Sequence, residues 1–245
     1  MKPKETTFVR RFSRRQRIEH FAVMVLFTIL AVTGLAQEFF HAGWAAGIIA
    51  GLGGIDRTRW IHRASGWLFT ALALEHFANQ MLAVMRGRAR PSMVPNRKDM
   101  RDAMLTLRYY LRLSEEKAAF DRYDYRQKFE YWGLVLGGTI MILTGFMLLY
   151  PMQAARMLPG QLIPAAVIVH GYEGLLAFLV VITWHIFNAH LAPDVFPGDT
   201  SIFTGKISRE RMQKEHPLEY ARDYPELPAE AAEPAPEPAL GAKPH

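Results

Sequence analysis

The chain has 245 residues, half of them hydrophobic, and carries 29 lysine and arginine side chains against 23 aspartates and glutamates. Long apolar runs alternate with polar connections, a distribution typical of a membrane protein and not of a single soluble core. The absence of cysteine excludes disulfides, thiolate-bound iron–sulfur clusters and covalently attached c-type haem within this chain.

The first half of the chain contains two apolar runs of membrane-spanning length. Residues 1–17 form a basic tail with seven Lys or Arg, and the first span covers about residues 18–37. An apolar Gly/Ala-rich piece at 43–54 is too short to cross a bilayer, so we expect it at the interface. The second span covers about residues 62–85.

The second half adds two more spans after a long polar connection at residues 86–128. Within that connection, residues 99–113 place apolar side chains at helical spacing, which predicts a helix on the membrane surface. The third span covers about 129–150 and the fourth about 164–191. The fold class that follows is an all-α integral membrane protein with a four-helix bundle.

The distribution of positive charge predicts the orientation of the bundle. Lysine and arginine concentrate in the N-terminal tail, in the 86–128 connection and after residue 191. Such segments face the cytoplasm, which places both termini on the cytoplasmic side of a bacterial inner membrane. The positive charge is thus explained by membrane orientation, and nucleic acid is not an expected partner. Residues 192–219 then form a cytoplasmic segment, and residues 220–245, rich in Pro, Ala and Glu, are predicted to be disordered.

Five histidines fall at two levels of the predicted bundle. At about 1.5 Å rise per residue, the fifteen residues from His170 to His185 separate them by about 22 Å on similar faces of one helix. In the predicted orientation, His62 and His170 lie near the outer face, whereas His20, His76 and His185 lie near the inner face. An imidazole in hydrocarbon needs partners for its nitrogen atoms.

These two levels predict two haem groups, because imidazole is a common axial ligand of haem iron. Six-coordinate iron takes two axial ligands, so His62 and His170 complete the outer level. The inner level offers three histidines for two positions, and depth alone leaves His20 and His76 as alternatives. The competing interpretation of every one of these histidines is an ordinary hydrogen bond to a neighbouring helix.

Other residues near the predicted haems are candidates for supporting roles. Gly66 and Gly174 each follow an outer-level histidine by one helical turn, where a missing side chain lets a flat macrocycle approach; such glycines also pack helices together. Arg63 is a candidate for binding a haem propionate or Glu173. Glu75 and Glu173 are acids within spans, able to carry protons or pair with a cation. Histidines outside the spans, such as His216, are expected to be solvated.

Short motifs mark the spans and the polar segment after the fourth: Arg17-Ile18-Glu19-His20-Phe21, Trp60-Ile61-His62, Tyr123-Asp124-Tyr125-Arg126-Gln127-Lys128, Thr144-Gly145, His170 with Gly174, His185-Ile186-Phe187, Gly205-Lys206-Ile207-Ser208-Arg209 and His216-Pro217. Together they make residues 8–217 resemble the cytochrome b (gamma) subunit of membrane-bound formate dehydrogenases. That family is related to the cytochrome b subunits of nickel–iron hydrogenases.

The resemblance implies a bundle that holds two non-covalent b haems. It implies His62 and His170 as ligands of the outer haem, and His20 with His185 as ligands of the inner one. We therefore favour His20 over His76, which is the alternative ligand. Members of that family pass electrons from a periplasmic catalytic subunit, through an iron–sulfur subunit, to the haems and then to quinone.

The resemblance also implies a quinone region near the inner face. It corresponds to Tyr123, Asp124, Gln127 and Lys128, with Asp124 in place of the family's Asn. These groups can bind a quinone carbonyl, but they also suit an ordinary polar helix start. The fourth span has one residue more between its histidines than the family pattern, which predicts a local bulge.

The sequence thus predicts a dihaem cytochrome b subunit of a respiratory oxidoreductase. It would carry electrons between a catalytic and iron–sulfur partner on the outer face and a menaquinone or ubiquinone pool. The alternative partners are a hydrogenase, a sulfur-compound reductase and a multihaem cytochrome c. Two other classes compete: a proton-coupled transporter, although the internal repeats and broken helices common in transporters are missing, and an anchor protein with vestigial histidines.

Overall fold

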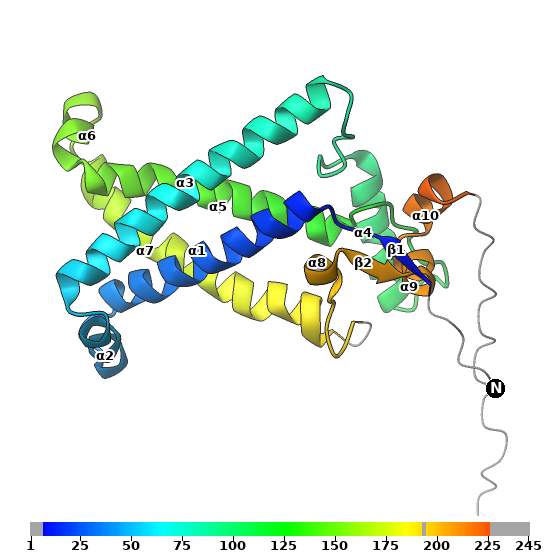
Figure 1. The fold of residues 1–245 in the computed structure, drawn as a ribbon, viewed down its shortest axis with the longest axis horizontal. Coiled ribbons are helices and arrows are strands. Elements are labelled where there is room, and N and C mark those ends of the chain that lie inside the picture. Colours follow the sequence, from blue (N-terminus) through cyan, green and yellow to red (C-terminus); the bar gives the residue numbers. More distant parts are fainter. Residues whose placement is uncertain (1–6, 193–194, 226–245) are drawn as a thin grey trace, which may run out of the picture.

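The computed structural model describes residues 7–192 and 195–225 and is mostly helical (Figure 1). Four helices are long and apolar enough to cross a membrane: α1 (Arg14–Glu38), α3 (Ile55–Met85), α5 (Tyr125–Leu149) and a fourth that runs from Leu162 to Leu191. The fourth consists of α7 (Leu162–Val180) and two π-helical turns, η1 (Val181–His185) and η2 (Phe187–Leu191). The four predicted spans are confirmed as long apolar helices. The local bulge predicted in the fourth is confirmed as π-helical turns.

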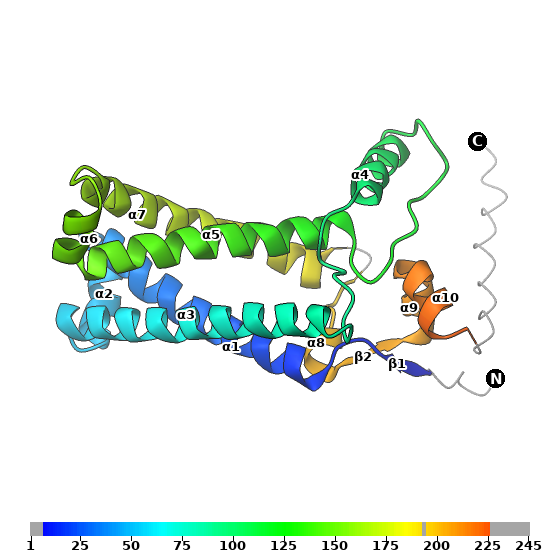
Figure 2. The same cartoon turned by 90° about the horizontal axis from the view of Figure 1, so that it is seen from above.

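The four long helices form two pairs. Helix α1 packs mainly against α3, and α5 packs mainly against α7. Figure 2 shows the α5–α7 pair lying over the α1–α3 pair. The short helices α2 (Gly43–Gly51) and α6 (Pro151–Met157) lie at one end, which we call the α2 end.

The opposite end, which we call the α4 end, carries the remaining elements. Helix α4 (Arg97–Tyr110) lies in the connection between α3 and α5, where the sequence predicts a surface helix. The other elements are α8 (Ser201–Thr204), α9 (Arg209–Glu215), α10 (Pro217–Asp223) and an antiparallel pair of strands, β1 (Phe8–Arg10) and β2 (Lys206–Ser208). The all-α prediction did not include this small sheet, which joins segments about 200 residues apart.

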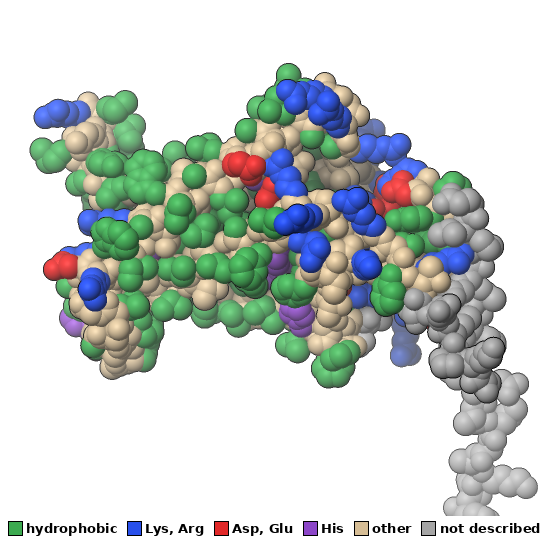
Figure 3. All heavy atoms as spheres, in the orientation of Figure 1, with side chains coloured by type: hydrophobic (Ala, Val, Ile, Leu, Met, Phe, Trp, Pro, Cys, Tyr) green, Lys and Arg blue, Asp and Glu red, His purple; other side chains and the backbone are tan. Residues whose placement is uncertain are grey.

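The outward surface of the long helices is apolar. Large hydrophobic side chains are exposed on all four, among them Phe21, Leu68, Leu136 and Ile168. Figure 3 shows hydrophobic side chains along the bundle, whereas lysine and arginine gather mainly toward the α4 end. Helices of this length satisfy their backbone hydrogen bonds internally, as a bilayer requires, so the chain is a multi-pass membrane protein.

All four long helices begin before the predicted spans, and side-chain caps mark two of these starts. Ser13 and Gln16 form a capping box at the start of α1, and Asp124 and Gln127 form another at the start of α5. Helix α3 begins at Ile55, well before the predicted second span. Hydropathy locates the apolar run, whereas the polar caps of α1 and α5 start the helical backbone ahead of it.

The C-terminal segment has more regular structure than the sequence predicts. Helix α10 crosses residue 220, so the predicted start of a disordered tail there is wrong. Tyr220 is buried with Val9, Ile207 and Met212 in a small core that joins β1, β2, α9 and α10. The rest of the predicted tail, residues 226–245, lies outside the described residues.

His216 is buried, and the expectation that it is solvated is wrong. Its Nδ1–H donates to the carbonyl oxygen of Asp121 at 2.8 Å, and its Nε2 accepts from the guanidinium of Arg11 at 3.1 Å. Arg11 forms a buried ion pair with Glu219. Burial, and secondarily the positive charge of Arg11, lowers the pKa of His216 to about 4.

Acidification should therefore loosen α9 and α10 from the rest of the α4 end. His216 in the unfolded segment takes up a proton near pH 6.5, whereas in the folded protein it stays neutral down to about pH 4. Stability is then lost as the pH falls through this window, by about 3 kcal/mol in total. Hydrogen exchange of the α9 and α10 amides, corrected for intrinsic rates, should show more frequent opening at the acidic end. Equal protection across the window would contradict the prediction, and a His216→Gln protein should lose most of the dependence.

Candidate functional site

Two pairs of histidines face each other across the space between the helix pairs. At the α2 end, His62 of α3 and His170 of α7 have ring centroids 6.3 Å apart. At the α4 end, His20 of α1 and His185 of η1 have ring centroids 6.2 Å apart. Two imidazoles that bind one metal ion from opposite sides, each through a nitrogen about 2 Å from it, place their ring centres roughly 6 Å apart. Each pair therefore has the separation needed to share one metal ion.

The surroundings of these pairs favour a site with only two protein ligands. Within residues 7–192 and 195–225, no group of three or more His, Cys, Asp or Glu side chains is placed to hold a metal ion. A Cβ atom at Gly66 would meet no described atom within 4 Å, and one at Gly174 would lie 3.4 Å from the Cε of Met141. The helix face one turn from His62 is thus open enough for a flat group.

At the α2 end, each histidine is bonded to a threonine of the neighbouring helix. The Nδ1 atom of His62 lies 2.9 Å from the hydroxyl oxygen of Thr33, and the Nδ1 atom of His170 lies 2.9 Å from that of Thr144. Sequence reasoning quoted Thr144 only as part of a family motif and missed Thr33. The same Thr-Gly dipeptide at both positions is the signal that would have found it.

At the α4 end, the third histidine is engaged elsewhere. The Nδ1 atom of His76 lies 2.9 Å from a carboxylate oxygen of Glu19, and its Nε2 lies 3.1 Å from the hydroxyl of Tyr131. His185 instead places Nδ1 3.6 Å from the Oε1 atom of Glu130, a buried oxygen without a hydrogen-bond partner among the described residues. Both nitrogens of His76 are therefore used within the bundle.

The residues predicted to bind quinone gather at the start of α5: Tyr123, Asp124, Gln127 and Lys128. Asp124 accepts from the backbone N–H of Gln127, whose side-chain oxygen accepts from the backbone N–H of Asp124. Lys128 donates to both carboxylate oxygens of Asp99 at 2.8 and 2.9 Å, and the Tyr123 hydroxyl accepts from Gln16 at 3.3 Å. The hydroxyl proton of Tyr123 and the amide NH2 of Gln127 take no part in these bonds.

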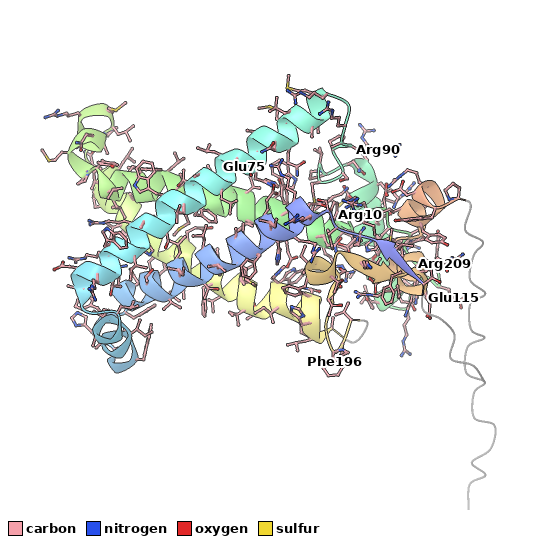
Figure 4. All side chains as sticks on the ribbon, viewed as in Figure 1. Arg10, Glu75, Arg90, Glu115, Phe196 and Arg209 are labelled. Atoms are coloured by element: carbon pink, nitrogen blue, oxygen red, sulfur yellow. The ribbon has the colours of Figure 1, made fainter. Side chains whose placement is uncertain are left out.

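The acids and the arginine predicted within the spans separate into different environments. Glu75 of α3, labelled in Figure 4, pairs with Arg15 of α1 at 2.5 Å, which is the predicted pairing with a cation. The carboxylate of Glu173 lies against Gly137 of α5. The side chain of Arg63 is exposed beside His62. The two partners predicted for Arg63 were Glu173 and a haem propionate. Glu173 is turned toward α5 and not toward Arg63.

Comparisons with known proteins identify the family. Residues 11–197 match the family model of prokaryotic cytochrome b561, whereas a comparison with the curated proteins finds no match. The matched region contains all four long helices and both facing histidine pairs. Proteins of this family bind b-type haem. The chain therefore belongs to the prokaryotic cytochrome b561 family.

Proposed function

We propose that the chain is a membrane electron-transfer subunit that holds two b haems, one at each end of the bundle. The facing histidine pairs carry this proposal, since ring separations of 6.3 and 6.2 Å fit two imidazoles on one iron. Their helices come from both pairs, so each haem would lie between the α1–α3 and α5–α7 pairs. Haem bound at both pairs would supply one-electron transfer across the apolar layer, because His170 and His185 lie fifteen residues apart on the fourth helix.

The donor groups of the chain fit haem. The sequence offers imidazoles and no thiolate, and haem iron held by two imidazoles needs no further protein ligand. The open face beside Gly66 leaves room for the macrocycle next to His62, and Gly174 takes the corresponding place beside His170. The exposed guanidinium of Arg63 is placed to bind a propionate.

At the α4 end, we propose His20 and His185 as the axial ligands and His76 as a neighbour. The ring of His20 faces that of His185, which supports this choice. A ligand must offer a nitrogen lone pair to iron, whereas both nitrogens of His76 already have partners in Glu19 and Tyr131. The oxygen of Glu130 is available to accept from Nδ1–H of a metal-bound His185.

We propose that quinone binds beside the start of α5, in contact with Tyr123 and Gln127. These two residues retain hydrogen-bond donors that can reach a quinone carbonyl. Asp124 and Lys128 are instead engaged in the helix cap and in the ion pair with Asp99. The predicted four-residue site is thereby narrowed to two residues that contact quinone, Tyr123 and Gln127, while Asp124 caps α5 together with Gln127, and Lys128 joins α5 to α4.

The charge distribution supports an α4 end that faces the cytoplasm. The α2 end would then meet the catalytic and iron–sulfur subunits of a formate dehydrogenase-like complex, or a cytochrome c. A hydrogenase or a sulfur-compound reductase as partner would require the same arrangement, with a haem near the partner and a quinone near the opposite face. Proteins that copurify from native membranes will identify which partner is used.

Replacing His62 by Ala should remove the haem at the α2 end and leave the other. The pyridine haemochrome assay should fall from about two protohaems per chain to about one, because two axial histidines hold each iron. His41→Ala, which changes an exposed histidine outside the long helices, is the matched control and should keep both. A His62→Ala protein with two haems at unchanged potentials would contradict the assignment, and wild-type protein without haem bands would favour a transporter.

The choice between His20 and His76 can be tested by replacing each with Ala. His20→Ala should lose the haem at the α4 end, because its ring faces His185. His76→Ala should keep two haems per chain, because the removed imidazole bonds only to protein groups in the structure. The same haemochrome assay decides between them. Loss of a haem from the His76 variant alone would show that the ligand lies on α3.

Replacing Tyr123 by Phe should slow quinone turnover and leave the haems intact. The change removes one hydroxyl, keeps the ring beneath Arg11 and Arg122, and leaves the α5 cap in place. Removing a hydrogen bond of this kind costs about 1 kcal/mol, or roughly fivefold in turnover at limiting quinone. Tyr150→Phe at the α2 end is the control. Wild-type kinetics with a quinol analogue in the Tyr123 variant would rule out this contact.

A further inference from the structure

The two histidines at the α2 end are held by duplicate structures on the two helix pairs. In each pair, the first long helix supplies a Thr-Gly dipeptide and the second supplies the histidine. Thr33 of α1 is hydrogen-bonded to His62 of α3, and Thr144 of α5 to His170 of α7. The distance between the hydroxyl oxygen and Nδ1 is 2.9 Å in both cases. Figure 2 shows these two helix pairs one above the other.

The duplication extends to the backbone around each threonine. Each threonine donates its hydroxyl proton to the carbonyl four residues earlier, at 2.6 Å for Thr33 and 2.7 Å for Thr144. The carbonyl oxygen three residues before each threonine lies 3.4 Å from the same hydroxyl oxygen in both cases. Both threonines are buried, at 2% and 8% exposure. Two segments more than 100 residues apart thus present the same set of acceptors.

The glycine that follows each threonine completes the contact with the ring. A Cβ atom at Gly34 would lie 3.1 Å from Cε1 of His62, and one at Gly145 would lie 3.2 Å from Cε1 of His170. Any side chain at these positions would push the imidazole away from its helix. We call the two dipeptides, Thr33-Gly34 and Thr144-Gly145, the imidazole sockets.

The hydrogen bonds of each socket determine which nitrogen carries the proton. The threonine hydroxyl has already donated its proton to a carbonyl, so toward Nδ1 it can only accept. Nδ1 must therefore be protonated in both histidines, which leaves the lone pair on Nε2, the nitrogen free to bind a metal.

We propose that the imidazole sockets are positioning elements that fix the tautomer and ring orientation of both axial ligands of one haem and lower its reduction potential. This inference rests on the proposed haem function. An acceptor on Nδ1–H makes the imidazole a stronger electron donor and so favours ferric iron. Among the residues that the structure describes, His185 has no such threonine partner, and its Nδ1 faces the Glu130 carboxylate. The sockets therefore act on one haem and not on the other.

The test uses Thr33→Val and Thr144→Val, which keep the shape of the side chain and remove the acceptor. Thr28→Val and Thr139→Val are matched controls, because these exposed threonines of α1 and α5 make the same bond to the carbonyl four residues earlier without touching a histidine. Spectroelectrochemical titration and low-temperature electron paramagnetic resonance of the purified protein give potentials and ligand-field signatures haem by haem.

Both Val variants should raise the midpoint potential and alter the low-spin signal of the same haem, with the second haem and both controls unchanged. Thr33→Ser and Thr144→Ser should restore wild-type values, because the hydroxyl returns. If a Val variant loses that haem, its retention in the Ser variant also supports the proposal. A Val variant with two haems at wild-type potentials and signals overturns it, as does equal loss in the Ser variant. Wild-type protein without two haems refutes the proposed function instead.

Discussion

An imidazole inside an apolar bundle must satisfy two nitrogen atoms, and the arrangement of the helices follows from how this is done. An unpaired polar group costs several kcal/mol where no water can reach it. At the α2 end, Nδ1 of each histidine bonds to a threonine, and the two rings lie 6.3 Å apart. His76 instead spends both nitrogens on Glu19 and Tyr131. The two histidines that face each other at the α2 end thus differ from His76, because their hydrogen bonds to threonine involve Nδ1 alone.

The two ends of the bundle solve this problem with different chemistry. Neutral hydroxyls hold the α2-end histidines, whereas a buried carboxylate oxygen of Glu130 lies near His185 at the α4 end. Groups around a ligand tune the metal that it binds, so the two proposed haems occupy inequivalent surroundings. The π-helical turns at Val181–His185 add to this difference, because they change the helical phase where the ligand sits.

Polar contacts at the α4 end connect the proposed quinone site to the chain's distant segments. Glu219 of α10 pairs with Arg11 and, at 2.5 Å, with Arg122, and both guanidinium groups lie over the ring of Tyr123 at 5.6 and 5.5 Å. His216 adds a bond to Arg11. The buried ion pairs thus hold the segment before α5 against β1 and α10. The residues proposed to meet quinone owe their position to contacts across most of the chain.

Local properties of the sequence determined the four spans, the two levels of histidines and the surface helix, because hydropathy and helical spacing act over one or two turns. The family resemblance added His20 as partner of His185. Only the tertiary structure decided that the ring of His20 faces His185, that Thr33 matches Thr144, and that His216 and Tyr220 are buried. These depend on how each helix is rotated about its axis and on contacts between segments far apart in the chain. Composition averaged over a window contains neither, which is why the prediction of a disordered tail from residue 220 missed the second half of α10.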